Sequence, residues 1–425
     1  MLSTGALARV EGEGAMHVEI RNGELVDVQL NIYEPPRFFE GFLRGRGLEE
    51  PADITARICG ICPVAYQMSA CLAIEDALGI DVDGQLRSLR HLLYCGEWIE
   101  SHSLHIHMLH APDFVGVDSV IEMAQEHRGA VERGLEVKKI GNSILETIGG
   151  RAIHPVNVRI GGFYRVPTRT ELQPLRDDLQ RGCDLAEQVV DWVATFDFAE
   201  QGIPHEMVAT DHPQEYPFLG SRVISNRGLS IDVSEFPQHF QEYQVEHSTA
   251  LHARMLERGE YLVGPVARFN LHRAKLAERA SAAVNRTGLD DGCWNPFQSI
   301  VVRAIEVLHA YETAISIVDA YERPEQPSVP YEARAGIGHG VTEAPRGLLY
   351  HRYEIDEQGL IADAVIVPPT AQNQDTIEHD LWHFVENHLD LEDDELRRRA
   401  EVTIRNHDPC ISCSTHFLDL TVDRS

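Results

Sequence analysis

Two pairs of cysteines at opposite ends of the chain constrain its fold more than any other feature. Cys59 and Cys62 lie near the start, in Arg-Ile-Cys-Gly-Ile-Cys, and Cys410 and Cys413 lie near the end, in Asp-Pro-Cys-Ile-Ser-Cys. The two sulfurs of a Cys-x-x-Cys can face one point, so two pairs supply four thiolates, enough to hold a metal without other ligands. A shared site requires the ends of the 425-residue chain to meet. We therefore expect one interlocked domain over residues 1–425.

A structural zinc knuckle, a set of redox dithiols and coincidence are the alternatives to a shared site. Cysteine pairs of a zinc knuckle usually stand about 15–20 residues apart, which argues against a knuckle here. A redox dithiol needs only one pair. The residues around both pairs argue against coincidence. The remaining cysteines are expected to be ordinary core residues: Cys71, Cys95, Cys183 and Cys293.

Charge and composition exclude several classes of partner. The chain has 37 basic and 67 acidic residues, a net charge of −30, and no basic block, so nucleic acids and anionic membranes are poor partners. No apolar run approaches the roughly 20 residues of a membrane span. The N-terminus does not resemble a signal peptide, and the cysteine usage suggests a reducing compartment without structural disulfides. We expect a cytoplasmic protein.

The hydrophobic pattern predicts a mainly helical fold with small antiparallel β hairpins (α+β) around a central bundle of long helices. Asn22-Gly23 predicts a hairpin turn, and Pro63 and Gly79 mark the ends of a helix that begins at the first cysteine pair. Histidines on the helix predicted over 85–111, which Pro112 would end, are expected to be packed core residues, with a second metal cluster as the alternative. The remaining predicted elements are the hairpin strands within 16–30, a helix from Asp118 to Gly149-Gly150, a mostly helical segment 170–330 with a long helix over 296–322, and strands near 348–356 and 360–367.

The motifs around the cysteines carry a family resemblance. Arg-Ile-Cys-Gly-Ile-Cys together with Asp-Pro-Cys-x-x-Cys-x-x-His resembles the large, catalytic subunit of nickel–iron hydrogenases, and the match runs from about Ala8 to His416. The resemblance implies the reaction H2 ⇌ 2H+ + 2e−. It implies that Cys59 and Cys410 are terminal nickel ligands, while Cys62 and Cys413 bridge nickel to an iron that carries CO and two cyanides.

The resemblance also assigns roles to residues that composition alone leaves unremarkable. Glu11 corresponds to a glutamate that relays protons to and from the thiolate of Cys410, a role that a carboxylic acid can fill. Arg346, Asp113 and Asp408 correspond to a polar group over the metals. Without the resemblance, Glu11 is an ordinary exposed acid and Arg346 an arginine beside a turn.

The same resemblance implies a pocket for the iron's diatomic ligands and a second metal ion. Residues expected around CO and cyanide are Pro345, Arg346, Val367, Pro368 and Thr370; Pro369 stands where a serine often donates to cyanide, a bond that Thr370 would replace. A magnesium ion, or sometimes iron, would be held by Glu40, the carbonyl of Val365 and His416. Without the resemblance, Glu40 fits equally well as a surface glutamate at a helix start.

One residue beside the first cysteine pair departs from the family pattern, and the last nine residues resemble a removable tail. Many relatives have a histidine four residues after the second cysteine, where this chain has Tyr66; its hydroxyl is a substitute donor, and we assign it no catalytic role. Residues 417–425 follow His416 and resemble a tail that a maturation protease removes after nickel insertion. The alternative is a short permanent extension.

Electrons must leave through other subunits, because the chain has too few cysteines for a chain of clusters. The resemblance implies an iron–sulfur small subunit, with His154 a candidate contact. The ending Cys-Ile-Ser-Cys-Ser-Thr-His most resembles cytoplasmic NAD(P)-linked enzymes of the sulfhydrogenase alpha type, which implies diaphorase, NAD(P)-binding subunits, since this chain has no Gly-x-Gly-x-x-Gly loop. Deazaflavin-reducing and heterodisulfide-reductase-linked hydrogenases are alternatives. So are a non-catalytic subunit, as in respiratory complex I, and a four-thiolate zinc or iron scaffold.

Overall fold

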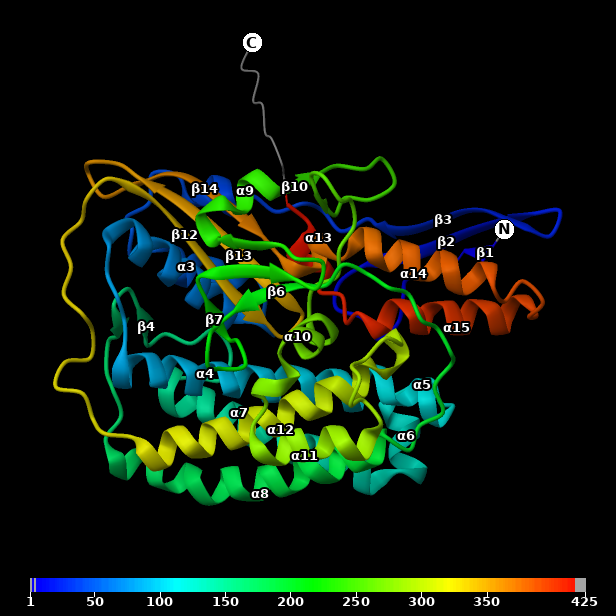
Figure 1. The fold of residues 1–425 in the computed structure, drawn as a ribbon, viewed down its shortest axis with the longest axis horizontal. Coiled ribbons are helices and arrows are strands. Elements are labelled where there is room, and N and C mark those ends of the chain that lie inside the picture. The colour runs from blue at the N-terminus through cyan, green and yellow to red at the C-terminus, as the bar shows by residue number, and fades with distance from the viewer. Residues whose placement is uncertain (1, 4, 417–425) are drawn as a thin grey trace, which may run out of the picture.

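Four long helices form one layer of the molecule (Figure 1). In this computed structural model, which describes residues 2–3 and 5–416, α4 packs against α7 and α12, and α8 packs against α7 and α12. Residues 299–311 of α12 are buried on every side, as expected for the central helix of a bundle. The predicted bundle is confirmed. Its helices are α4 (Gly84–Leu104), α7 (Arg128–Gly149), α8 (Arg169–Val193) and α12 (Ser299–Ala320).

A four-stranded antiparallel sheet lies above the bundle (Figure 1). Helix α3 (Pro63–Leu78) packs against its strands β12 and β13, and two glycines of β12 permit the close approach. A Cβ atom on Gly338 would lie 2.0 Å from the carbonyl oxygen of Ala73, and one on Gly340 would lie 2.5 Å from that of Ser69. The order is β14 (Ile361–Val367), β13 (Gly347–Ile355), β12 (Gly336–Ala344) and β7 (Leu219–Gly220).

The two ends of the chain pack against each other (Figure 1). Strands β2 (Gly14–Arg21) and β3 (Glu24–Ile32) form the predicted antiparallel hairpin around Asn22-Gly23. Helix α14 (Gln374–Glu386) packs on β3 and on α15 (Asp393–Asn406). Their shared apolar core is separate from that of the bundle, and it includes residues from both ends of the sequence. This packing brings the two cysteine motifs together.

The segment between α8 and α12 differs from the expected mostly helical one. Residues 206–255 form short strands whose buried residues share an apolar core with β12, β13 and β14. Each strand is too short for its alternating pattern to stand out in the sequence. The short strands are β1 (Leu2–Ser3), β4 (Val158–Arg159), β5 (Gly162–Phe163), β6 (Val208–Asp211), β8 (Arg222–Ser225), β9 (Ser230–Asp232), β10 (Phe240–Tyr243) and β11 (His252–Met255). The other helices are α1 (Phe39–Leu43), α2 (Pro51–Thr55), α9 (Phe236–His239), α10 (Pro265–His272), α11 (Glu278–Thr287), α13 (Pro369–Gln372) and α16 (Ile411–Ser414).

Two predicted helix ends were wrong. Helix α4 does not end at Pro112; it continues through a π-helical turn, His105–His110, into α5 (Ala111–Val115). Pro112 lies in the first turn of α5, where a missing N–H costs little. Asp118 does not cap the next helix; the hydroxyl of Ser119 accepts the N–H of Glu122 and begins α6 (Val120–Glu126). Helix α7 follows after a break at His127 and ends at Gly150 as predicted.

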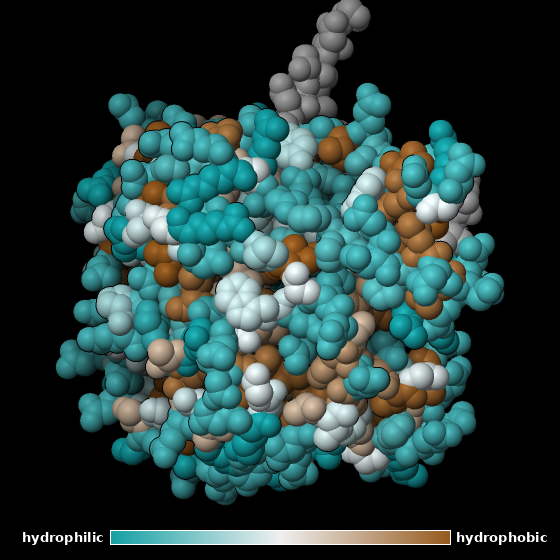
Figure 2. Space-filling view, turned by 45° about the vertical axis from the view of Figure 1, so that its right-hand side comes forward, coloured by the Kyte–Doolittle hydropathy of each residue, from teal (hydrophilic) through white to brown (hydrophobic). Residues whose placement is uncertain are grey.

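The visible surface is mainly polar. Figure 2 shows hydrophilic side chains over most of one face, with hydrophobic ones in small separate groups. Among the residues that the structure describes, no helix combines the length and apolar character needed to cross a bilayer.

Candidate metal centre

The four motif cysteines meet at one buried point. Their sulfur atoms all lie within 4.8 Å of one another; the Cys59 and Cys410 sulfurs are 3.5 Å apart, and those of Cys410 and Cys413 are 2.6 Å apart. All four thiols are free, and each residue is at most 5% exposed. The structure thus brings together the four residues that the sequence predicted as ligands.

The first pair is held at the N-terminus of α3. Cys62 is the residue before the helix, and the N–H groups of Ile61 and Cys62 point at the Cys59 sulfur at 3.3 and 3.2 Å. The carboxylate of Glu97 on α4 accepts the N–H groups of Val64 and Ala65, at 2.5 and 3.0 Å. These bonds satisfy the free N–H groups of the helix end and fix the cysteine loop to the bundle. No sequence motif marked Glu97.

The second pair is held by the N-terminal segment. The N–H of Ile411 donates to the carbonyl of Glu11, and the N–H of Ser412 donates to the Glu11 carboxylate at 3.1 Å. A Cβ atom on Gly12, whose φ is +90°, would lie 2.6 Å from the Cβ of Ile411. Only glycine therefore allows the two segments to pack so closely.

The thiols lose protons as a set rather than one by one. Hydrogen bonds from Cys410, Cys413 and Cys62 hold the pKa of Cys59 well below its usual value, and Arg346 lowers it further. The pKa of Cys410 is raised, because it donates to sulfurs that take up the negative charge. Negative charge in the set is therefore favoured first at Cys59.

Arg346 lies in the two-residue turn of the β12–β13 hairpin, after Pro345. Its Nε donates to the carbonyl oxygen of Asp408 at 2.8 Å, and its Nη2 donates to the Asp408 carboxylate at 3.1 Å. Burial opposes its charge, but Asp408 and the cysteine sulfurs hold its pKa well above the usual value. Its Nη1 and the Oδ2 of Asp408 have no hydrogen-bond partner among the described residues. A donor and an acceptor are thus left free beside the thiols.

Buried Arg268 supports this turn. It donates to the carbonyl oxygen of Pro345 at 3.0 Å and pairs with Glu306 and Glu343. The network lies in the core, where breaking one partner of a buried ion pair costs about 3–5 kcal/mol. No motif marked Arg268 in the sequence.

The loop after β14 closes another side of the site. Thr370 is buried, and its hydroxyl oxygen accepts the N–H of Cys410 at 3.0 Å, which leaves the hydroxyl hydrogen free to donate elsewhere. Val367 and Pro368 are also buried; the Val367 carbonyl accepts Gln372 Nε2 at 3.2 Å, and Pro368 is the residue before α13.

Tyr66 lies on the first turn of α3 with its ring buried. Its pKa is raised well above the usual value, first by burial and then by Cys413, Cys62 and Cys410. Its hydroxyl has no hydrogen-bond partner among the described nitrogen and oxygen atoms. Tyr66 therefore lies beside the sulfurs of both cysteine pairs.

A carboxylate and histidine group lies behind Cys413. Burial raises the pKa of Glu40 to about 7, its Oε1 accepts the N–H of Ile366 at 2.7 Å, and its Oε2 is 3.9 Å from Nδ1 of His416. The other ring nitrogen of His416 is 3.1 Å from Glu242 on β10, which the sequence did not mark. Nδ1 of His416 has no hydrogen-bond partner among the described residues. Val365, whose carbonyl was predicted as a further ligand, precedes Ile366 on β14.

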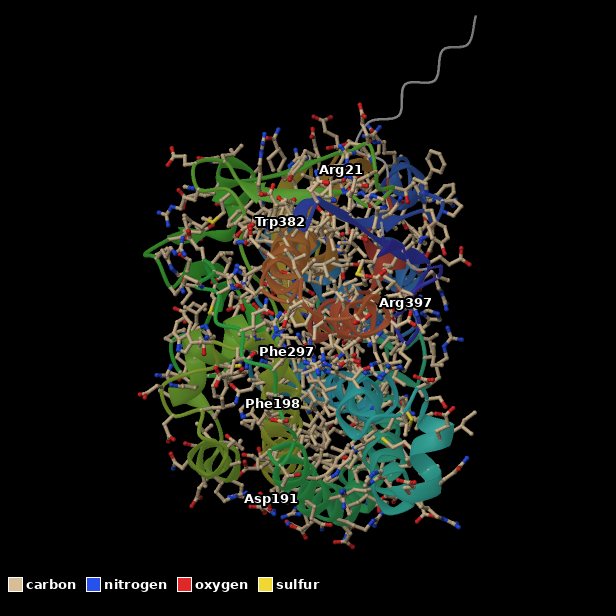
Figure 3. The ribbon with its side chains drawn as sticks, turned by 90° about the vertical axis from the view of Figure 1, so that its right-hand side faces the viewer. Arg21, Asp191, Phe198, Phe297, Trp382 and Arg397 are labelled. Atoms are coloured by element: carbon tan, nitrogen blue, oxygen red, sulfur yellow. The ribbon has the colours of Figure 1, made fainter. Side chains whose placement is uncertain are left out.

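Asp113, predicted in the polar group over the metals, is held by two arginines. Its carboxylate pairs with Arg405 at 2.8 Å and with Arg9, and no hydrogen bond or ion pair joins it to Arg346 or Asp408 in the described part of the chain. These residues line a cavity of about 540 Å³ beside α15. Figure 3 shows Phe198 and Phe297, which line the same cavity, between the bundle and α15. The Asp113 carboxylate therefore forms ion pairs with two arginines.

The histidines of the α4 region are packed in the core, as predicted. His102 bonds to Glu306 at 2.9 Å, His105 to the carbonyl of Arg405 and His110 to Asn406. His107 bonds to the carbonyl oxygen of Ser103 at 3.1 Å. They do not converge on one point in the described structure.

The cysteine site fits a nickel–iron centre better than a closed zinc site. Four thiolates select soft metals. A four-thiolate zinc ion would leave Arg346 Nη1 and the Thr370 hydroxyl hydrogen without acceptors, whereas diatomic ligands on an iron would supply them. The free donors beside the sulfurs therefore favour a metal with non-protein ligands. Residues 417–425, where we predicted a removable tail, lie outside the described residues.

Comparisons with known proteins agree with this arrangement. Residues 37–148 and 294–416 match the family described as nickel-dependent hydrogenase. The chain is 32% identical over 420 residues to sulfhydrogenase 1 subunit alpha of Pyrococcus furiosus, with 97% of each chain covered. It is 26% identical to the NAD-reducing hydrogenase HoxS subunit beta of Cupriavidus necator, with 97% and 94% covered. A crystal structure of an NAD+-reducing [NiFe]-hydrogenase in the H2-reduced state matches with a TM-score of 0.88 and 25% identity, covering 98% and 99%.

Proposed function

The chain belongs to the nickel-dependent hydrogenase family, and from that premise we propose that it passes electrons between H2 and NAD(P)+ through other subunits. It is the catalytic subunit of the enzyme and acts on H2. The observation that carries the proposal is the convergence of four buried thiols beside free donor groups. The non-catalytic alternative is disfavoured because the chain keeps all four cysteines.

The four cysteines would hold nickel, with Cys62 and Cys413 also binding an iron that carries CO and cyanide. When bound, such a centre splits H2 and takes up its electrons. Arg346 keeps a fixed positive charge in a buried pocket, where a donor is worth more than in water. Thr370 and the backbone around Val367 and Pro368 shape the side where the iron ligands would lie.

We assign the movement of the proton to Glu11. Its carboxylate accepts the N–H of Ser412, which lies between Cys410 and Cys413, and its backbone forms a β-bridge with that of Cys410. The hydroxyl of Ser412 donates to Glu34 at 2.9 Å, and Glu34 is partly exposed. In this proposal a proton released at the Cys410 sulfur would pass to the Glu11 carboxylate and from there toward partly exposed Glu34, whose carboxylate accepts the hydroxyl of Ser412.

Replacing Glu11 with glutamine is expected to lower H2 oxidation by about 10²–10⁴-fold, because the amide cannot relay a proton. Nickel content should not change, since the amide oxygen still accepts the N–H of Ser412. The rate is measured with an artificial electron acceptor. The neighbouring Glu13→Gln is the control, as Glu13 is exposed. Full activity in Glu11→Gln would exclude the relay.

Tyr66→Phe tests the tyrosine that replaces the usual histidine. We expect the variant to keep nickel but to shift the CO and cyanide stretches, because the hydroxyl lies near the Cys413 sulfur and changes its charge. Tyr94→Phe is the control, since that buried hydroxyl donates to Thr342 at 2.7 Å. Identical infrared spectra for Tyr66→Phe and the unmodified protein would show that the hydroxyl does not act on the centre.

A second ion would bind behind Cys413. Glu40 and His416 offer a carboxylate oxygen and an unpartnered ring nitrogen, and a cation would offset the closeness of Glu40 to Glu242. We assign magnesium, or iron, to this place, with a backbone carbonyl near Val365 as a further ligand. The ion would tie the C-terminal segment to β14.

An exposed apolar surface near the first cysteine pair suits a small subunit. Ile153, Val156 and Tyr164 are each about half exposed, and His154 bonds to the carbonyl of Ala56, three residues before Cys59. An iron–sulfur subunit on this surface would lie next to the metal centre and carry its electrons onward. A maturation protease acting on residues 417–425 completes the proposed set of partners, and a reducing, cytoplasmic location fits the free cysteines.

The acceptor is tested with the assembled enzyme, purified without oxygen. Under H2 we expect reduction of NAD+ or NADP+, because a relative and a structural neighbour are described as NAD-reducing. Reduction of a deazaflavin, or of a heterodisulfide by the assembly, without NAD(P)+ reduction would overturn the NAD(P) assignment and leave the hydrogenase activity standing.

A further inference from the structure

A second cluster of metal-ligating side chains lies outside the cysteine site. One nitrogen each of His205 and His379 and one oxygen of Glu260 lie within 4.8 Å of one another. They come from three segments: the loop before β6, the connection between β11 and α10, and helix α14. We propose that these three residues bind a divalent metal ion of the zinc class, with water completing the coordination.

The first argument is an unpartnered nitrogen aimed at the cluster. His205 is 7% exposed, and its Nδ1 has no hydrogen-bond partner among the described residues. This atom lies 3.8 Å from Oε1 of Glu260. Ligands of a tetrahedral zinc ion, at bond lengths of about 2.0–2.1 Å, stand about 3.4 Å apart. The separation of these two ligand atoms is therefore close to that of two zinc ligands, and the ring of exposed His379, which contacts the same oxygen of Glu260, would turn to admit the ion.

The second argument is the support behind His205. Its other nitrogen, Nε2, bonds to the carboxylate of Asp380 at 2.7 Å, and Asp380 is fully buried. A carboxylate behind a ligating histidine fixes the ring and leaves the opposite nitrogen free to bind a metal. His205 has this arrangement.

Charge balance favours a divalent cation. Two carboxylates flank His205: Asp380, which is fully buried, bonds to one ring nitrogen, and Glu260 faces the other. His379 on the solvent side contacts the same oxygen of Glu260 that faces His205.

The site would join α14 to the segment that carries the cysteines. The other oxygen of Asp380 accepts from His407 at 2.8 Å, and His407 precedes Asp408, the partner of Arg346. A metal on His205 would therefore also hold Asp380 and His407, and through them the segment beside the proposed nickel–iron centre.

Metal analysis of the assembled enzyme, after zinc-supplemented expression and a brief chelator wash, tests the proposal. We expect His379→Ala and Glu260→Gln each to contain one zinc fewer per chain than the unmodified enzyme. His383→Ala, one turn further along α14, should keep the full amount. The exposed position of His379 makes its loss tolerable to the fold.

Nickel measured in the same samples separates this site from the cysteine site, because nickel should be equal in all four proteins. Added zinc should also raise the midpoint of thermal unfolding of the unmodified enzyme more than that of His379→Ala. Equal zinc in the unmodified enzyme, His379→Ala and Glu260→Gln would overturn the proposal. So would loss of zinc from His383→Ala to the same extent.

Discussion

Cys410→Ser is expected to lose nickel and, with it, H2 oxidation. Cys410 lies at the centre of the site: its sulfur is 3.5 Å from that of Cys59 and 2.6 Å from that of Cys413. A serine hydroxyl is a hard ligand that stays protonated at neutral pH, so it cannot replace the thiolate. Substitution of a residue that hydrogen-bonds to a metal ligand, without binding the metal itself, typically lowers metal affinity about 10–100-fold. The loss of a ligand itself should exceed that range.

Nickel per chain, measured on the purified assembly, is the readout for this variant. Cys183→Ser is the matched control, because Cys183 is equally buried and its sulfur contacts Arg279 rather than the motif cysteines. The control should keep its nickel and its activity. Normal nickel in Cys410→Ser would contradict the assignment of this cysteine as a ligand.

Arg346→Lys is expected to lower H2 oxidation by about 10²–10³-fold while the metals remain bound. The guanidinium holds Asp408 with Nε and Nη2 and leaves Nη1 free beside the thiols. A lysine keeps the charge but cannot reproduce this fork. Losing one such donor in a buried site costs about that factor in rate.

Infrared spectra and nickel content of Arg346→Lys show whether the centre has assembled. Arg352→Lys is the control, since Arg352 lies on β13 of the same hairpin and pairs with Asp363 and Glu354 near the surface. An ion pair of that kind contributes about 0–1 kcal/mol. Unchanged activity in Arg346→Lys would mean that the guanidinium has no role in the reaction.

The sequence predicted those parts of the fold that are encoded locally. Asn22-Gly23 predicted the hairpin turn, and Pro63 and Gly79 predicted the ends of α3, because each residue type favours one backbone conformation. The central bundle followed from long helical patterns. The strands of residues 206–255 were missed because each is only two to four residues long, too short for an alternating pattern to stand out.

In the site, motif residues could be predicted and their supports could not. Cys59 and Cys410 stand in recognisable motifs, whereas Glu97 and Glu242 are single acids far along the chain from the residues that they hold. Only tertiary packing brings such carboxylates to a helix end or a histidine. Asp113 was marked by the resemblance alone, and its two arginine partners, which come from opposite ends of the chain, could not be predicted.

An infrared spectrum of the anaerobically purified protein tests the bimetallic centre most directly. Mass spectrometry first selects protein from which residues 417–425 have been removed, so that immature chains do not contribute. We expect stretches from one CO and two cyanides on iron, and no four-thiolate zinc site or non-catalytic subunit would have such ligands. Their absence from the processed protein would contradict the assignment of a nickel–iron centre to the four cysteines.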